Sequence, residues 1–201
     1  MPGVFGRTNQ SFPAVWLRLE VPLVSSEIDS LAEAAVASGL PLDLSTMPAL
    51  WGGKMRGSGG VLSCVSSADY ERANDSGHAG NLVQAHLIES LSCIGREFWD
   101  FYFLRFRGSV SESILSGVFE ALEMAKQEGH IRFVGLCSEG SASATLSMWS
   151  LHDAFDAILI PRAEDVGVLG GMARQRRVGV LAPSGGDIEL RSVRKADEVP
   201  G

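Results

Sequence analysis

The sequence has few cysteines and no excess of basic residues, and both features exclude classes of function. Its 201 residues include three cysteines, Cys64, Cys93 and Cys137. Three unevenly placed cysteines cannot build a disulfide framework, and no zinc-type spacing occurs among them. There are 17 Lys and Arg residues against 24 Asp and Glu residues, a net charge of -7. Nucleic-acid binding needs a basic face that neutralises phosphates, so we expect none.

Long apolar runs and dinucleotide-binding fingerprints are also missing. No segment reaches the roughly 18 apolar residues of a membrane-spanning helix, and the N-terminus has no signal-peptide-like run. Because free thiols suit a reducing compartment, we expect a cytoplasmic protein that does not bind membranes. No Gly-x-Gly-x-x-Gly motif follows an expected strand, so the usual dinucleotide-binding fold has no support.

Apolar, β-prone segments alternate with segments of helical periodicity. The strongest strand is 98–106, in which five of nine residues are Phe or Tyr and a sixth is Trp. The clearest helix is 114–128, which has apolar residues at three- and four-residue spacing. We expect seven strands, at 14–19, 40–44, 61–65, 98–106, 131–137, 154–160 and 178–182. We expect helices after Ser26 and at 81–95, 114–128, 143–151 and 166–176.

This alternation predicts an α/β fold with parallel strands joined by right-handed crossovers. From periodicity alone, an open doubly wound sheet and a (β/α) barrel both remain open. Segment 47–60 is rich in glycine, so we expect a loop between the second and third strands. We divide the chain into a main domain, 1–186, and a C-terminal tail, 187–201.

Two segments resemble the aldo-keto reductase family closely. Residues 89–106, ESLSCIGREFWDFYFLRF, look like the family stretch SLxRLGxDYIDLYLxHW. Residues 119–138, FEALEMAKQEGHIRFVGLCS, look like EALEELVxEGKIRxIGVSN. Segments 6–17, 155–161 and 178–186 add weaker similarity in the family's order. The resemblance implies a TIM-type (β/α) barrel, reduced to about seven parallel strands, with its site at the strand C-termini.

The same resemblance implies that the family's Asp, Tyr, Lys and His tetrad is largely absent. The Asp position falls on Asp43, and the Lys and His positions fall on Val65 and Arg105. The tyrosine position falls on Pro48 or Ala49, so no proton donor stands there. Trp51 is nearby, but an indole N–H does not act as an acid.

The family's NADPH-binding positions are altered as well. The pair that holds the nicotinamide amide falls on Cys137 and Ser138, and the family's glutamine falls on Leu159. The residue that stacks on nicotinamide falls on Leu181 or Ala182, and the phosphate-binding eighth strand has no recognisable counterpart. We therefore expect no NADPH, and no other cofactor or metal.

Several remaining polar residues are candidates for a site. Arg105 could bind a carboxylate or phosphate, or it could pair with Asp43 or a loop carboxylate. Tyr70 and His78 lie in segment 66–80 and form the one acid–base pair expected there, unless that segment is a solvated surface loop.

Four further residues are candidates for ligand binding: Cys137, Ser138, Arg162 and Trp51. Cys137 could be a nucleophile or a small residue that fills the strand end. Arg162 could line a polar pocket or pair with Glu164 or Asp165.

Three functions fit these observations. The first is a protein repurposed to bind or transform a small, anionic molecule without a redox step. The second is a non-catalytic partner or regulatory subunit, a type of drift known in this fold from the glutamate–cysteine ligase modifier subunit. The third is a residual reductase with a rearranged site.

A seven-stranded barrel would also leave two open edges. Ile188 and Leu190 alternate with charged residues in segment 187–194, which predicts a short strand. The preceding turn, 184–186, is too short for a parallel crossover. We therefore expect an antiparallel hairpin, or a homodimer or partner protein that pairs with the open edge.

Overall fold

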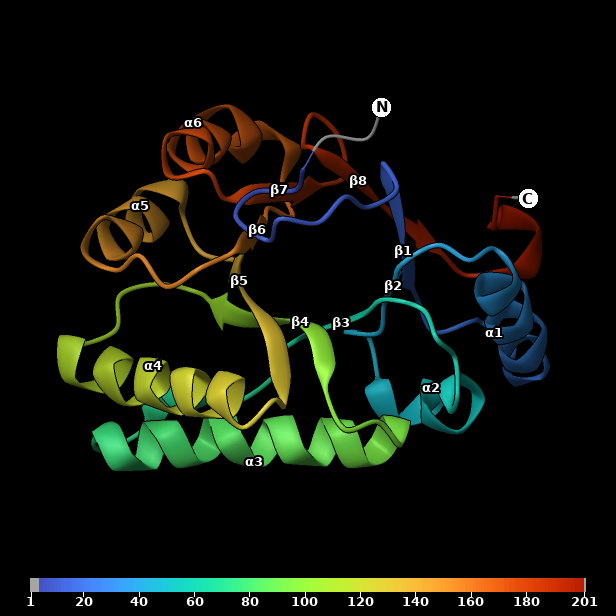
Figure 1. Ribbon diagram of the computed structural model, residues 1–201, viewed down its shortest axis with the longest axis horizontal. Coiled ribbons are helices and arrows are strands. Elements are labelled where there is room, and N and C mark those ends of the chain that lie inside the picture. The colour runs from blue at the N-terminus through green and yellow to red at the C-terminus, as the bar shows by residue number, and fades with distance from the viewer. Residues whose placement is uncertain (1–3, 201) are drawn as a thin grey trace.

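The computed structural model describes residues 4–200, and its strands form a closed, all-parallel barrel in sequence order. Figure 1 shows the strands in the middle and the helices around them, with α3 and α4 side by side. The TIM-type barrel is thus confirmed, with eight strands in place of about seven. The strands are β1 Val15–Leu19, β2 Leu42–Asp43, β3 Leu62–Val65, β4 Trp99–Phe106, β5 Ile131–Ser138, β6 Ala157–Leu159, β7 Gly179–Ala182 and β8 Ile188–Val193. The α-helices are α1 Ile28–Ala37, α2 Pro48–Met55, α3 Ser76–Ile94, α4 Glu112–Gln127, α5 Ala142–Leu151 and α6 Val166–Arg176.

The tail closes the barrel, which corrects two expectations. β8 pairs in parallel with β7 and with β1, so it is neither an antiparallel hairpin strand nor an open edge. A short connection suffices because β8 begins beside the end of β7, with Ile188 opposite Leu181. The chain therefore need not travel back along the whole length of the barrel. Gly185 turns the connection with a φ of +74°.

Segment 47–60, expected to be a loop, contains helix α2. Pro48 stands in its first turn, where a missing N–H does no harm. A Cβ on Gly52 would lie 1.8 Å from the carbonyl oxygen of Cys93 on α3. The glycine thus permits close packing of two helices, and its presence was misleading as a loop signal.

Helix α3 begins earlier than its apolar periodicity suggests. Asp75 caps it by accepting the backbone N–H of His78 at 2.8 Å. His78 consequently lies in the first turn of a helix and not in a loop.

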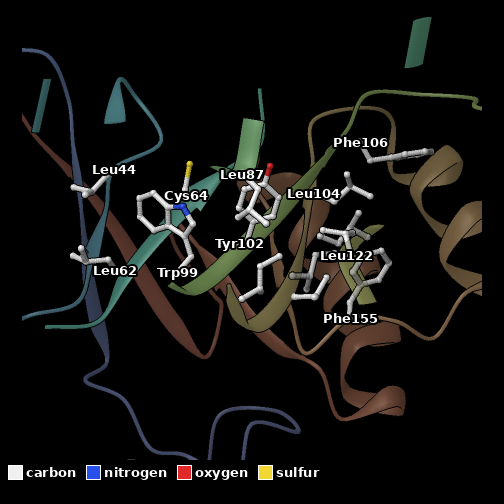
Figure 2. Packing of buried hydrophobic residues seen from close by; sticks show 14 of the residues in the cluster. Leu44, Leu62, Cys64, Leu87, Trp99, Tyr102, Leu104, Phe106, Leu122 and Phe155 are labelled. Carbon is white, nitrogen blue, oxygen red and sulfur yellow. The ribbon is translucent and has the colours of Figure 1, made fainter. Parts of the chain in front are cut away.

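Most buried side chains belong to a layer between the barrel and its helices. Figure 2 shows Tyr102, Leu104 and Phe106 of β4 in this layer, with Leu87 of α3 and Leu122 of α4. Trp99 donates its indole N–H to Ser90 on α3 at 3.0 Å. The alternate residues of β4, Phe101 and Phe103, belong to a second cluster inside the barrel. The phenylalanine-rich segment therefore serves two cores at once.

The N-terminal end of the barrel is filled by aromatic side chains. Phe5 and Phe12, from the segment before β1, pack edge-on against each other and against Phe101. Trp16 completes this cluster and is fully buried. Two charged residues of the strands, Arg18 and Arg105, stand toward the opposite, C-terminal ends of β1 and β4. No helix among residues 4–200 is long and apolar enough to cross a membrane.

Candidate functional site at the barrel mouth

Arg18 and Asp43 form an ion pair at the C-terminal ends of β1 and β2. The two residues are register partners, and the Arg18 Nε donates to Asp43 Oδ2 at 2.6 Å. The other Asp43 oxygen accepts the backbone N–H of Ser45 at 3.2 Å and the Ser45 hydroxyl. The Ser45 hydroxyl oxygen in turn accepts the Val65 N–H at 2.8 Å. Burial disfavours the Arg18 charge, but Asp43 outweighs this and raises the pKa of the guanidinium.

A second ion pair joins Arg105 at the end of β4 to Glu139, just after β5. The Arg105 Nε lies 3.2 Å from Glu139 Oε1. This Nε is buried, and its contact with Glu139 is an ion pair that lacks the geometry of a hydrogen bond. Of the two partners expected for Arg105, the structure shows the loop carboxylate, because Asp43 pairs with Arg18.

Arg107 extends this pair into a network across the β3, β4 and β5 loops. Its guanidinium lies 3.4 Å from Asp69, 3.8 Å from Glu71 and 3.8 Å from Glu139. Its backbone N–H donates to Glu71 at 3.0 Å. Glu139 thus bridges two arginines at the mouth.

Cys137 lies inside the barrel beside both ion pairs. It is the register partner of Arg105 and is 2% exposed. Burial and the nearby Glu139 carboxylate raise the pKa of the Cys137 thiol to about 12. At neutral pH the thiol is protonated, so Cys137 is not an activated nucleophile. The alternative role, a small residue that fills the strand end, fits this position.

Ser63 adds a buried polar group to the same interior. It is the register partner of Asp43 on β3, it is 1% exposed, and its hydroxyl has no partner among the described residues. Arg18, Asp43 and Ser63 therefore stand in register on three adjacent strands.

Tyr70 is neither paired with His78 nor part of a solvated loop, the two alternatives that the sequence left open. It is buried, and its hydroxyl donates to the backbone oxygen of Arg105 at 2.6 Å. Burial raises the pKa of Tyr70 above its ordinary value. His78 is exposed at the start of α3, where its Nδ1 is 3.5 Å from the Asn74 N–H. No hydrogen bond joins Tyr70 and His78 within residues 4–200.

Three residues that we expected to bind a ligand make contacts within the protein. Ser138 is fully buried and shares a hydrogen bond of 2.7 Å with Thr145 of α5. Trp51 is fully buried in α2 and belongs to the cluster outside the barrel. Arg162 donates to Asp165 at 2.7 Å and also to the Gly140 carbonyl. The structure thus brings together Asp43, Arg105 and Cys137. Arg162 lies on a neighbouring loop and pairs with Asp165, one of the two alternatives that we expected.

Sequence reasoning missed Arg18, Glu139 and Ser63. Arg18 gave a usable signal, because it is a charge in the strand VWLRL at an alternate, inward position. Glu139 directly follows a predicted strand, where parallel barrels place their functional groups. Ser63 gave no signal of its own.

Two cavities lie away from this mouth. A cavity of about 530 Å³ lies between α1 and α2 and is lined by Asp29, Val36 and Lys54. A cavity of about 480 Å³ lies near the start of β4 and is lined by Arg96, Phe98 and His130 among others.

Comparisons with known proteins give a fold and no sequence relative. No protein-family model and no curated protein match the sequence. Within the described residues, no group of His, Cys, Asp and Glu could hold a metal ion.

Solved aldo-keto reductases, by contrast, superpose well. The holo form of an aldo-keto reductase from Bacillus halodurans gives a TM-score of 0.73 at 14% identity, over 90% of this chain and 65% of that one. An aldo-keto reductase from Klebsiella pneumoniae, solved with NADP and acetate, gives 0.72 at 18% identity over 90% and 66%. One from Pseudomonas aeruginosa gives 0.74 at 14% identity over 99% and 91%. The chain spans about two thirds of the first two proteins. It therefore has the (β/α)8 barrel fold of the aldo-keto reductases, as its sequence resemblance implies.

Proposed function

We propose that this protein binds a small anionic molecule at the C-terminal mouth of the barrel and does not reduce carbonyls with NADPH. The observation that carries the proposal is the Arg105 guanidinium at the mouth, whose buried Nε lies 3.2 Å from the Glu139 carboxylate without the geometry of a hydrogen bond. An anion that replaces Glu139 and accepts from this N–H in good geometry would gain a charge-assisted hydrogen bond that the ion pair lacks. Arg18, at the end of β1, supplies a second guanidinium on the inward face.

The chemistry at the mouth supports a non-redox role. Carbonyl reduction needs a general acid near the substrate. Pro48 and Ala49 occupy the region where the resemblance places the tyrosine, and Tyr70 is committed to a backbone oxygen. The Cys137 thiol, with its pKa raised to about 12, is a poor acid at neutral pH.

Glu139 is the group that an anion would replace. Its carboxylate is 38% exposed and lies between Arg105 and Arg107. A partly exposed ion pair contributes little net stability, so its exchange for a ligand is inexpensive.

The experiment is a calorimetric titration with inorganic phosphate and with acetate. Arg105→Ala should weaken binding by about 10–100-fold, because a hydrogen bond to a charged group contributes about 1.5–3 kcal/mol. Arg132→Ala is the matched control, since Arg132 is half-exposed at the opposite end of β5. Equal affinity in the native protein and in Arg105→Ala would refute the assignment.

A fluorescence titration with NADPH tests the absence of redox function separately. We expect no binding in the low micromolar range. Tight NADPH binding would favour the residual reductase.

The role as a partner or regulatory subunit stays a prediction without support from the barrel edge. All eight strands are paired on both sides, so the barrel offers no open edge to a second copy or partner, and the prediction of a partner is left to other surfaces. Light scattering on the purified protein would show whether another surface supports self-association.

A further inference from the structure

Four exposed apolar side chains lie on the two loops that follow β1 and β2. Val21, Leu23 and Val24 follow β1 and are 36%, 86% and 52% exposed. Met47 follows β2 and is 55% exposed. Single exposed apolar residues are ordinary, but three of these stand within four consecutive positions. We call these four residues the apolar collar.

The two halves of the collar are tied together beside the Arg18–Asp43 pair. Glu20, which precedes Val21, accepts the hydroxyl of Thr46, which precedes Met47, at 3.3 Å. The other Glu20 oxygen accepts the Ser192 hydroxyl at 3.2 Å, which fixes this junction to β8. Arg18 lies two residues before Glu20 on the same strand end, so about 7 Å of backbone separates them at the usual rise per residue.

Met47 also has an unusual backbone. Its φ of 123° and ψ of 76° lie outside the regions that L-residues favour. The following Pro48 disfavours a helical conformation at Met47. Such conformations concentrate at ligand-binding sites, where surrounding contacts hold them. Here the strained residue holds an exposed apolar side chain at the mouth of the barrel.

We propose that the site takes an amphipathic anion, with its charged head on Arg105 and Arg18 and its apolar tail across the collar. This inference rests on the proposed anion binding at Arg105. The ligand class follows from the order of groups at the end of β1. The Arg18 guanidinium lies inside, the Glu20–Thr46 contact follows it, and the apolar side chains of the collar lie outside. A linear carboxylate with an alkyl chain has the same order of charge and apolar surface.

The experiment compares acetate, octanoate and octanol in calorimetric titrations. Each fully buried methylene strengthens binding by about fourfold. The collar covers one side of a tail, so octanoate should bind at least about tenfold more tightly than acetate. The double variant Leu23→Ser, Met47→Ser should lose this advantage and keep its acetate affinity. Leu151→Ser is the matched control, because Leu151 is 73% exposed at the far end of α5.

Other outcomes separate the two proposals. If octanoate and acetate bind equally and both depend on Arg105, anion binding stands and the tail site is overturned. If neither binds, both proposals fail. If octanol binds as tightly as octanoate, the apolar collar acts without the arginines, and the head-and-tail arrangement is overturned. If the native protein dimerises and Leu23→Ser makes it monomeric without changing octanoate affinity, the collar is an interface between copies and the inference is again overturned.

Discussion

Asp187 closes the barrel, and its removal should loosen the last strand. Asp187 stands between β7 and β8 and makes two contacts with Val180. Its carboxylate accepts the Val180 N–H at 2.9 Å, and its own backbone N–H donates to the Val180 oxygen at 2.9 Å. Asp187→Ala keeps the backbone contact and leaves the Val180 N–H, on a buried strand, without its acceptor.

The expected loss is about 1–2 kcal/mol, because the lost acceptor is charged but Asp187 itself is exposed to water that partly replaces it. For a domain of this size, each kcal/mol lowers Tm by about 2–4 °C, so Tm should fall by about 2–8 °C. Thermal unfolding followed by circular dichroism measures the fall. Amide exchange at Val180 measures the local effect and should become faster in the variant.

Asp187→Asn is the control, because its amide oxygen can still accept the Val180 N–H. It should lose less than half as much stability as Asp187→Ala. An unchanged Tm together with an unchanged exchange rate at Val180 in Asp187→Ala would refute the argument that this side chain holds β8 to β7.

Three further predictions concern packing, pH and thiol reactivity. Gly117→Ala should destabilise the protein by about 1–3 kcal/mol in urea unfolding, because the new Cβ would lie 1.9 Å from the Ser76 oxygen. In the control, Gly167→Ala in α6, the new Cβ meets nothing within 4 Å, so this variant should be neutral or stabilising. Equal effects of the two variants on stability would contradict this prediction. His86 accepts the Ser67 N–H and bonds to the Tyr102 hydroxyl at 2.7 Å, and burial lowers its pKa. The neutral form is therefore favoured in the fold, and stability should fall as pH drops below about 6.5, the unfolded value, toward the lower folded pKa; a His86→Gln variant with the same pH dependence as the native protein would exclude this source. Of the three cysteines only Cys93 is exposed. Iodoacetamide at neutral pH should therefore modify one thiol in the native protein and three in denaturant, as measured by mass spectrometry. Rapid labelling of Cys137 in the native protein would contradict its burial.

The sequence predicts the repeating parts of this fold well and its closure poorly. Helix α6 begins and ends where its periodicity predicts, and β4 differs from the prediction by one residue. Such segments carry their own signal, because buried faces repeat at a fixed spacing. The strand in segment 187–194 was predicted correctly, as β8 shows, but its parallel pairing was not, because the length rule for parallel connections assumes that the chain travels back along the whole strand. The offset between neighbouring strands of a barrel is a property of the closed sheet and is not written locally.

The site was predictable only where a strand end could be located. Arg105 and Cys137 were placed correctly because their strands are long and apolar. The burial of Tyr70 was not predicted, since it depends on how the loop after β3 folds against β4, and no local pattern encodes that contact. The segment around Gly52 was predicted as a loop for a similar reason, because glycine occurs both where two helices pack closely and in flexible loops.

Structural support alone does not account for the charges at the mouth. A buried ion pair such as Arg18–Asp43 loses most of its Coulombic gain to desolvation, so apolar residues of similar volume would serve stability as well or better. The interior is otherwise packed with aromatic and aliphatic side chains, which shows that this barrel can fill its centre without charge. Polar side chains on the inward face include Arg18, Asp43, Ser63 and Arg105, which lie on four adjacent strands. The Ser63 hydroxyl is a further buried polar group at this end, and it has no hydrogen-bond partner among the described residues. Charged groups at the strand ends are thus a feature that stability alone does not account for, and this supports the proposed binding site there.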